Sequence, residues 1–545
     1  MRSLERAASS LLLLALGACS GPAATTPPAV PPPAPAPGPV VGPASNQPEI
    51  KADLRIDPPE ALGAENAKSP PPADAAPPPA TAPVADNRPR MGAVGPFAYI
   101  YKSPSGAGLA LGYIRMGTSV VLRTGKPEGN SPGCARGWYA VEPRGYACLA
   151  SGRTTLDVND PYFKALQSVA PTTDAVWYYR YAFSNGAPMY SRVPTEAEAE
   201  KEEAKLGPRG SFVQLGKWSA GHEELLEKEP IKATDPVPEI FAGGTRHVGG
   251  GTFNPDVLRW RTIPNGSMVA YAKAFEQGGR TWLMTPDLML VPADRVRSIR
   301  RSTFHGVKLE GGLSLPLAWN RTKAMKTKYK RENGALTAVT DSFPSKTWLP
   351  VGEAKEMIDG KAYYPVRGEP ETFVAESDIT LSTARKGLPR GVSPGEKWIE
   401  VKILPGTLTA YVGETPVMAT LFSPGKGGVP VPGNDNTVYA TTATGYFPIE
   451  WKDHVATMSN EKGAPSVLWF TDVPHIQYLK APLAMHVAYW HEDFGNPKSA
   501  ECVNVAPEDG HFLFNWTEPG LPEGWGAIRP GDGAGKSTPV IVTAQ

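Results

Sequence analysis

Short apolar runs separated by turn-forming residues fill the chain from residue 91 to its end. In KWIEVKI, at 397–403, apolar residues alternate with Glu400 and Lys402, which predicts a strand with one face in a core. The runs TLTAYV and PVMATLF flank Gly413-Glu414 and predict a hairpin. PTEAEAEKEEAKLG, at 194–207, has the charge pattern of an exposed helix, and we interpret its charges as a solvated face. The pattern predicts a mainly β protein.

The same pattern divides the chain into regions. The runs FAYIY at 97–101 and SVVL at 119–122 lie between glycine-rich turns, which predicts a small all-β module at 91–160. Its ending, GWYAVEPRGYACL, resembles the SH3-like domains of bacterial cell-wall enzymes. The stretches 278–296 and 360–379 end in a similar way, so we expect a β-rich middle region at 161–390 with two further SH3-like modules. A β-rich C-terminal domain is expected at 396–545.

The first residues have the layout of an export signal. Two arginines precede the apolar run from Leu11 to Leu16, which is much too short to span a bilayer as a folded helix. The run then leads to Leu16-Gly17-Ala18-Cys19, which resembles the lipobox of bacterial lipoproteins. This resemblance implies a signal peptide at 1–19 and lipidation of Cys19, and Ser20, rather than Asp, implies anchoring to the outer membrane. A plain signal peptide with a chance cysteine is the alternative.

A tether is predicted to follow the signal. Of the 60 prolines, 21 fall within residues 1–90, mostly among Ala, Thr and Gly. Such a sequence cannot form a core, so residues 20–90 are expected to be a disordered Pro/Ala-rich linker. As polyproline II it would reach ~200 Å. That length would let a membrane-anchored domain search the nearby cell wall.

Charge and motif spacing exclude several function classes. The chain of 545 residues carries 55 basic and 54 acidic residues, so no overall field points to a nucleic-acid partner. GDGAGKST, at 531–538, resembles a phosphate-binding loop, but Gly531 is one residue too close to Gly-Lys and the chain ends soon after Thr538. His491-Glu492 lacks a second histidine at zinc-protease spacing. We therefore expect no nucleotide, no metal and no cofactor.

The four cysteines are Cys19, Cys134, Cys148 and Cys502. An exported chain sits in an oxidising compartment, so Cys134 and Cys148 are expected to form a disulfide. Closing a loop of about 15 residues stabilises the fold by ~3 kcal/mol in the chain-entropy model. Cys502 is then left unpaired, and an unpaired thiol in such a compartment is either buried or functional.

The stretch around Cys502 carries a resemblance to a known family. PLAMHVAYWHEDFGNPKSAECVNVAPEDGHFLFNW, at 482–516, resembles the catalytic domain of the L,D-transpeptidases, with a YkuD-like fold, whose signature is a His, a spacer, then Ser-His-Gly-Cys, an apolar residue and Asn or Arg. His486, Ser499, Cys502, Val503 and Asn504 match that signature. The hairpin at 398–428, TTATGYFPI at 441–449 and the segment 507–525 resemble other parts of the domain in the right order. The resemblance implies a β-sandwich or barrel with a short helix after the nucleophile.

The resemblance also implies a reaction. His486 would take the proton of the Cys502 thiol, and the thiolate would attack the bond from an L-centre to the terminal D-alanine of a wall tetrapeptide stem. Backbone N–H groups at the turn carrying Cys502 would hold the oxyanion. D-alanine would leave, and an acceptor amine would resolve the thioester as a cross-link. Water in place of the amine would make the protein a carboxypeptidase or hydrolase.

The sequence departs from the family where His-Gly is expected, because Ala500-Glu501 stands there. Glu501 introduces a side chain and a carboxylate next to the thiol, which would raise the thiol pKa if it points inward. Impaired activity is one outcome, and a silent buried thiol in a wall-binding lipoprotein is another. We interpret His475, His491 and His511 as packing or surface residues, with His491 as the best candidate for an accessory role.

These observations predict an exported, periplasmic lipoprotein that acts on peptidoglycan stem peptides. The expected site residues are Cys502 as nucleophile, His486 as general base and acid, Ser499 and Asn504. The expected contact with a membrane is the lipid on Cys19.

Overall fold

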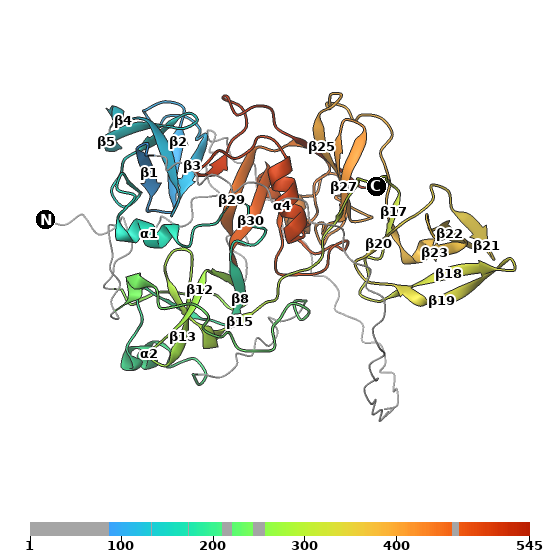
Figure 1. The fold of residues 1–545 in the computed structure, drawn as a ribbon, viewed down its shortest axis with the longest axis horizontal. Coiled ribbons are helices and arrows are strands. Elements are labelled where there is room, and N and C mark those ends of the chain that lie inside the picture. Colours follow the sequence, from blue (N-terminus) through green and yellow to red (C-terminus); the bar gives the residue numbers. More distant parts are fainter. Residues whose placement is uncertain (1–86, 132, 173, 210–220, 243–256, 460–467) are drawn as a thin grey trace, which may run out of the picture. The chain divides into compact units, whose positions relative to one another are not determined.

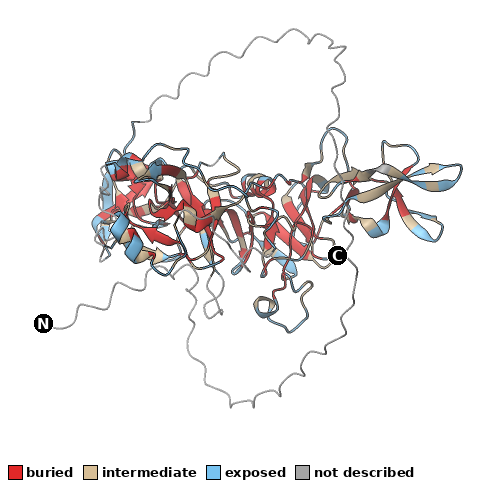
Figure 2. Cartoon of the chain, turned by 90° about the horizontal axis from the view of Figure 1, so that it is seen from below, coloured by how far each residue is buried: buried red, intermediate tan, exposed pale blue. Residues whose placement is uncertain are grey.

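The computed structural model describes residues 87–131, 133–172, 174–209, 221–242, 257–459 and 468–545. These residues form mainly β-structure, which confirms the expected fold class (Figure 1). Buried residues gather in the strands and exposed residues in the loops (Figure 2). Within the described residues, no helix has the length and apolar character needed to cross a membrane. The predicted signal peptide, Cys19 and the linker up to residue 86 lie outside the described residues.

The first β-region runs from residue 90 to residue 155, so its first strand takes up the last residue assigned to the linker. Its strands are β1 (Arg90–Ala93), β2 (Phe97–Tyr101), β3 (Gly112–Arg115), β4 (Ser119–Ser131), β5 (Cys134–Val141), β6 (Tyr146–Cys148) and β7 (Thr154–Thr155). They pair in the order β3-β2-β6-β5-β4-β1-β7 around a core that includes Ile100, Leu122 and Val141. A disulfide joins Cys134 and Cys148, the pairing expected from the sequence.

The second region begins with a helix and contains strands of two sheets. Its elements are α1 (Pro161–Gln167), β8 (Arg180–Ser184), β9 (Pro188–Tyr190), α2 (Glu196–Glu202), β10 (Arg259–Thr262), β11 (Met268–Tyr271), β12 (Lys273–Gln277), β13 (Arg280–Met284), β14 (Leu290–Pro292) and β15 (Val296–Ser298). One sheet has the order β10-β9-β14-β13-β12, and β15, β8 and β11 belong to a larger sheet described below. Short 3₁₀ turns lie at Glu239–Phe241 and Ala293–Arg295.

The third region forms two small antiparallel sheets and contributes its first strand, β16, to a sheet of the C-terminal region. Its elements are β16 (Val307–Lys308), β17 (Leu317–Trp319), β18 (Lys326–Glu332), β19 (Ala335–Phe343), β20 (Trp348–Pro350), β21 (Glu356–Ile358), β22 (Lys361–Pro365), β23 (Thr372–Ala375), a 3₁₀ turn at Glu376–Asp378, and β24 (Thr380–Ser382). The sheet orders are β20-β17-β24 and β19-β18-β23-β22-β21. The strands expected in 278–296 and 360–379 are confirmed. The SH3-like character of these regions stays a prediction.

The C-terminal region packs one sheet and one helix against strands of a second sheet. Its elements are β25 (Lys397–Lys402), β26 (Thr407–Val412), β27 (Thr415–Leu421), α3 (Asn436–Tyr439), β28 (Gly445–Pro448), β29 (Trp451–Ser459), β30 (Trp469–Lys480), β31 (Leu483–Val487), β32 (Val503–Val505), α4 (Pro507–Trp516), β33 (Trp525–Ile528) and β34 (Pro539–Thr543). The order β16-β27-β26-β25-β34-β28 contains the predicted hairpin, β26 and β27. Ile399 and Leu408 from this sheet meet Met485 and Val503 from the other, together with Leu513 of α4. The expected helix after Cys502 is confirmed.

Strands from three regions join in one large sheet. Its order is β15-β8-β11-β30-β29-β33-β3-β2-β6-β5-β4-β1-β7, with β31 and β32 branching from β30. Tyr113 of β3 donates a hydrogen bond to Asp453 of β29 at 2.5 Å, and Arg115 forms an ion pair with Asp472 of β30. The second region thus covers an edge of β30, and the first region covers an edge of β33.

Two sequence interpretations are wrong in detail. Glu400 was assigned to the polar face of its strand, yet it is buried, with its carboxylate paired to Arg385 at 2.9 Å and to Lys402 at 3.3 Å. The alternation of KWIEVKI could not reveal this, because Arg385, which pairs with Glu400, lies outside the strand. The helix at 194–207 is confirmed as α2, but Glu203 at its end is buried against Arg280 and Arg295, rather than solvated.

The junction of β3 and β33 gives a stability prediction. A Cβ atom at Gly112 would lie 2.1 Å from the carbonyl oxygen of Ala527 and 2.6 Å from the ring of Trp525. We expect Gly112→Ala to lower the free energy of unfolding by about 1–3 kcal/mol, because backbone must move. Chemical denaturation measures this change. Gly520→Ala, where a Cβ meets nothing within 4 Å, is the control, and equal effects of the two would contradict the prediction.

Candidate active site

A parallel pair of short strands brings the predicted site residues together. Met485 pairs with Val503 and His486 with Asn504 along β31 and β32, and Cys502 immediately precedes β32. Since side chains two residues apart share a face of a strand, Cys502 and Asn504 lie on the same face as His486. Met485, Val503 and Val505 point the other way, into the core. The spacing of the signature therefore places the thiol and the imidazole on one side of one sheet.

The thiol of Cys502 is half-buried and protonated. Burial raises its pKa to about 12; the backbone N–H of Ala484, which donates to the sulfur, opposes this rise, and the charge of Glu501 adds to it. The Sγ–H faces the carbonyl oxygen of Pro482 at 3.6 Å, within hydrogen-bonding range for sulfur. Cys502 is therefore a neutral thiol at physiological pH.

The imidazole of His486 is held in one tautomer. Its Nδ1 lies 3.0 Å from the carbonyl oxygen of Val487. Because a carbonyl only accepts, Nδ1 carries the proton and Nε2 keeps its lone pair. The ring is buried and stacks on Trp490, with ring centroids 5.8 Å apart. Burial lowers the pKa of His486 to about 4, so the ring is a neutral base.

Ser499 shapes the turn that carries the thiol. Its hydroxyl donates to the carbonyl oxygen of Cys502 at 2.6 Å, and its backbone N–H donates to Pro424 at 3.1 Å. The N–H of Lys426 donates in return to the carbonyl of Ser499 at 2.9 Å. The hydroxyl thus holds backbone in place, and Ser499 has a positioning role.

The side-chain amide of Asn504 contacts the imidazole of His491. His491 Nδ1 accepts the N–H of Asp493 at 3.2 Å, so in the neutral ring Nε2 carries the proton and faces the Asn504 amide at 3.2 Å. Among the described residues the Oδ1 of Asn504 has no hydrogen-bond partner. The amide orientation in which Oδ1 accepts from His491 Nε2 satisfies both groups. His491 therefore packs beneath the site and orients Asn504.

Glu501 lies beneath the turn and contacts α3. It is buried, its carboxylate accepts from the hydroxyl of Thr437 at 3.1 Å, and its carbonyl accepts from Thr442 at 2.7 Å. Ala500 beside it is exposed. For the backbone N–H of Cys502, no hydrogen-bond acceptor is found among the described residues. That N–H is available to an oxyanion, whereas the Glu501 charge acts on the sulfur from inside the fold.

Two aromatic residues belong to the site although the sequence analysis did not single them out. Tyr478 of β30 pairs with Ala484, whose other neighbour is Cys502, so the phenol and the thiol flank a small side chain on one face. Burial raises the pKa of Tyr478, with Asp453 and Cys502 adding to the rise, so the phenol stays protonated. Trp490 stacks on His486. The sequence pattern that could have identified Tyr478 is the alternation in the hairpin IQYLKAPLAMH, which puts Tyr478, Ala484 and His486 on one face.

His475 and His511, the other two histidines considered in the sequence analysis, pack elsewhere. His475 is buried, its Nδ1 lies 3.0 Å from the Tyr178 hydroxyl, and its ring meets that of His511 from α4 at 5.1 Å. This agrees with their interpretation as packing residues. No group of three or more His, Cys, Asp or Glu side chains suited to a metal ion occurs in the described part of the chain.

Comparisons with known proteins give only distant likenesses. No protein-family model matches the chain, and no curated protein sequence matches it at a significant level. The catalytic domain of an E. faecium L,D-transpeptidase is similar at 19% identity over 27% of this chain and 98% of that chain, with a TM-score of 0.20. L,D-transpeptidase 3 from Mycobacterium tuberculosis is similar at 13% identity over 40% and 79%, with a TM-score of 0.21. TM-scores this low assign neither a fold nor an activity.

A pH profile tests the protonation state of Cys502. Because the thiol pKa is about 12, we expect its alkylation by iodoacetamide to rise about tenfold per pH unit from pH 7 to pH 10, without a plateau. The measurement uses the chain carrying Cys19→Ser, in which Cys502 is the one unpaired thiol. A plateau between pH 6 and pH 8 would contradict the prediction, since it would reveal a resting thiolate–imidazolium pair.

Glu501 gives a second prediction. Glu501→Gln keeps an acceptor for Thr437 but removes the charge that raises the thiol pKa. We expect alkylation of Cys502 at pH 8 to become roughly threefold to tenfold faster. Glu508→Gln, at an exposed carboxylate on α4, is the matched control. If the two variants react at the same rate, the Glu501 charge does not act on the thiol.

Proposed function

We propose that the protein is a peptidoglycan L,D-transpeptidase that acts through a thioester on Cys502. The single observation that carries the proposal is the β31–β32 pairing, which puts a thiol and an imidazole whose Nε2 keeps its lone pair on one face. The resemblance of residues 396–545 to the catalytic domain of this family supplies the substrate class. The SH3-like modules would position this domain on the wall, and a lipid on Cys19 would anchor it in the periplasm.

The proposed reaction uses these groups in turn. His486 Nε2 takes the proton from Cys502, and the thiolate attacks the carbonyl carbon of the bond to the terminal D-alanine. The N–H of Cys502 stabilises the oxyanion. When the C–N bond breaks, His486 returns the proton to the departing amine, D-alanine leaves, and a thioester remains. An acceptor amine then attacks the thioester, His486 takes its proton, and the thiol is restored as the new amide forms.

The resting site is not poised for this reaction. The thiol holds its proton far more tightly than the imidazole does, so transfer between them is unfavourable before substrate binds. Bound substrate must change the surroundings of the sulfur, and the Glu501 carboxylate works against that change. Slow acylation is the expected consequence.

The same observations favour a second candidate, a wall-binding lipoprotein that has kept the fold without catalysis. The raised thiol pKa and the buried carboxylate of Glu501 support it. A hydrolase would use the same acyl-enzyme with water as the acceptor, so it differs from the transpeptidase only in its products.

Intact mass separates catalysis from binding. We expect the full chain to gain the mass of a carbapenem on Cys502, and Cys502→Ala to gain none. Ala500→His with Glu501→Gly should speed adduct formation by about tenfold or more, since an inward charge is removed and the turn is freed. A folded parent without an adduct, combined with an adduct after this double change, would contradict catalysis and leave wall binding.

A further inference from the structure

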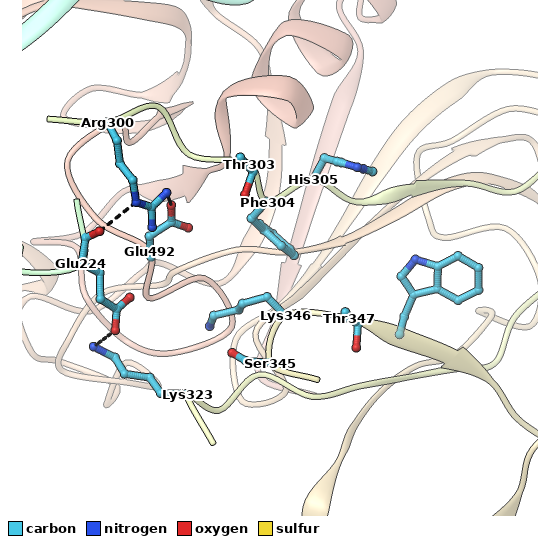
Figure 3. Close-up of a pocket in the computed structure, with 11 residues that line it drawn as sticks. Glu224, Arg300, Thr303, Phe304, His305, Lys323, Ser345, Lys346, Thr347 and Glu492 are labelled. Carbon is cyan, nitrogen blue, oxygen red and sulfur yellow. Dashed lines mark hydrogen bonds and ion pairs between the residues drawn. The ribbon is translucent and has the colours of Figure 1, made fainter. Parts of the chain in front are cut away.

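A cavity lies next to the loop that follows His486. Its volume is 580 Å³, within the range of about 300–1,000 Å³ typical of small-molecule sites. The 300–305 segment, the loop before β20 and Glu492 line it (Figure 3). Phe304 and Trp348 contribute an apolar part, and charged side chains contribute the rest. Neither Cys502 nor His486 lines this cavity.

Charges of both signs face the cavity. Lys323 pairs with Glu224, and Arg300 pairs with Glu492 at 3.2 Å. The side chains of Glu224 and Lys323 are 42% and 65% exposed, so this pair can open without loss of buried contacts. Glu492 is held more firmly, because its second oxygen accepts the hydroxyl of Ser302 at 3.1 Å. The cavity therefore offers an exposed carboxylate and an exposed ammonium side by side.

Lys346 is the distinctive group of the cavity. Its ammonium donates to the carbonyl oxygens of Arg321 at 2.8 Å and of Phe494 at 2.5 Å. For its third N–H, no acceptor is found among the described residues, and in Figure 3 the side chain extends toward Glu224 and Lys323. The residue also has a φ of 58°, a left-handed conformation that is kept only where the surroundings fix it. A cation held this way, with one donor unused, suits an anionic ligand group.

We infer that this cavity binds a peptidoglycan stem peptide through its free amine and a free carboxylate. The ligand carboxylate would contact Lys346 and Lys323, and the ligand ammonium would contact Glu224. The identity of the ligand rests on the proposed function, whereas its charge pattern rests on the cavity alone. A neutral glycan would displace water from these charged side chains without supplying an opposite charge. A ligand with both charges replaces that water with ion pairs, so the peptide is favoured over the glycan.

Binding to the full chain carrying Cys502→Ala tests this inference without chemistry at the thiol. The probes are a tetrapeptide stem with free amine and carboxylates, the same peptide with the amine acetylated, the same peptide with the carboxylates amidated, and a peptide-free wall glycan. Isothermal titration calorimetry should show binding of the first probe. The two blocked peptides should bind with a Kd at least about 10-fold higher. Equal binding of the three peptides, or binding of the glycan alone, would overturn the inference.

Variants locate the site. Lys346→Met, Lys323→Met and Glu224→Gln should each raise the Kd of the free peptide by about 10-fold or more. The last two are exposed and keep the fold if Lys346→Met loosens it. Lys355→Met and Glu376→Gln, which break an exposed pair at 2.9 Å away from the cavity lining, are the matched controls. Unchanged binding in Lys323→Met and Glu224→Gln would place the peptide elsewhere.

The result is independent of the proposed catalysis. Carbapenem addition to the chain with Cys502 intact reports the thiol site. An adduct without peptide binding at the cavity would remove the inference and leave the proposed function in place. Peptide binding that depends on Lys323 and Glu224, without any adduct, would keep the cavity as a wall-binding site in a protein without catalysis.

Discussion

The parallel pairing of β31 with β32 is the constraint on which the candidate site depends. Sheet register alone puts Cys502, His486 and Asn504 on one face, while the alternate residues Met485 and Val503 bury themselves in the core. A slip of one residue would send the thiol into the core. The helix α4 and the sheet containing β25 and β26 pack on the opposite side and hold this register.

The Cys502 thiol and the His486 imidazole are both neutral in the resting site. The half-buried thiol and the buried imidazole both favour their neutral forms, because the fold removes water without supplying an opposite charge. The tautomer of His486 is already correct for accepting a proton. The thiol and the imidazole therefore share one face of the sheet without forming a thiolate–imidazolium pair, and the Glu501 charge contributes to the raised pKa of the thiol.

Local pattern predicted much of this structure. Alternation identified β25 and the β26–β27 hairpin, the close spacing of Cys134 and Cys148 together with an expected export signal led to the disulfide, and the signature at 482–516 identified the residues that β31 and β32 bring together. The features that the sequence analysis missed depend on partners that are distant in the sequence. Glu400 is buried because Arg385 pairs with it, and the direction of Glu501 is fixed by Thr437. Lys346 meets Phe494 across a long stretch of sequence, so no local pattern could indicate the cavity.

The most direct test of the account is exchange of the terminal residue of a stem peptide. The full chain would be incubated with a tetrapeptide stem and isotope-labelled D-alanine, and the peptide mass would be followed. Acyl transfer through Cys502 predicts that label enters the terminal position, and that Cys502→Ala abolishes it. If the folded parent neither incorporates label nor releases unlabelled D-alanine while it still binds the peptide, the claim that Cys502 is a working nucleophile is contradicted.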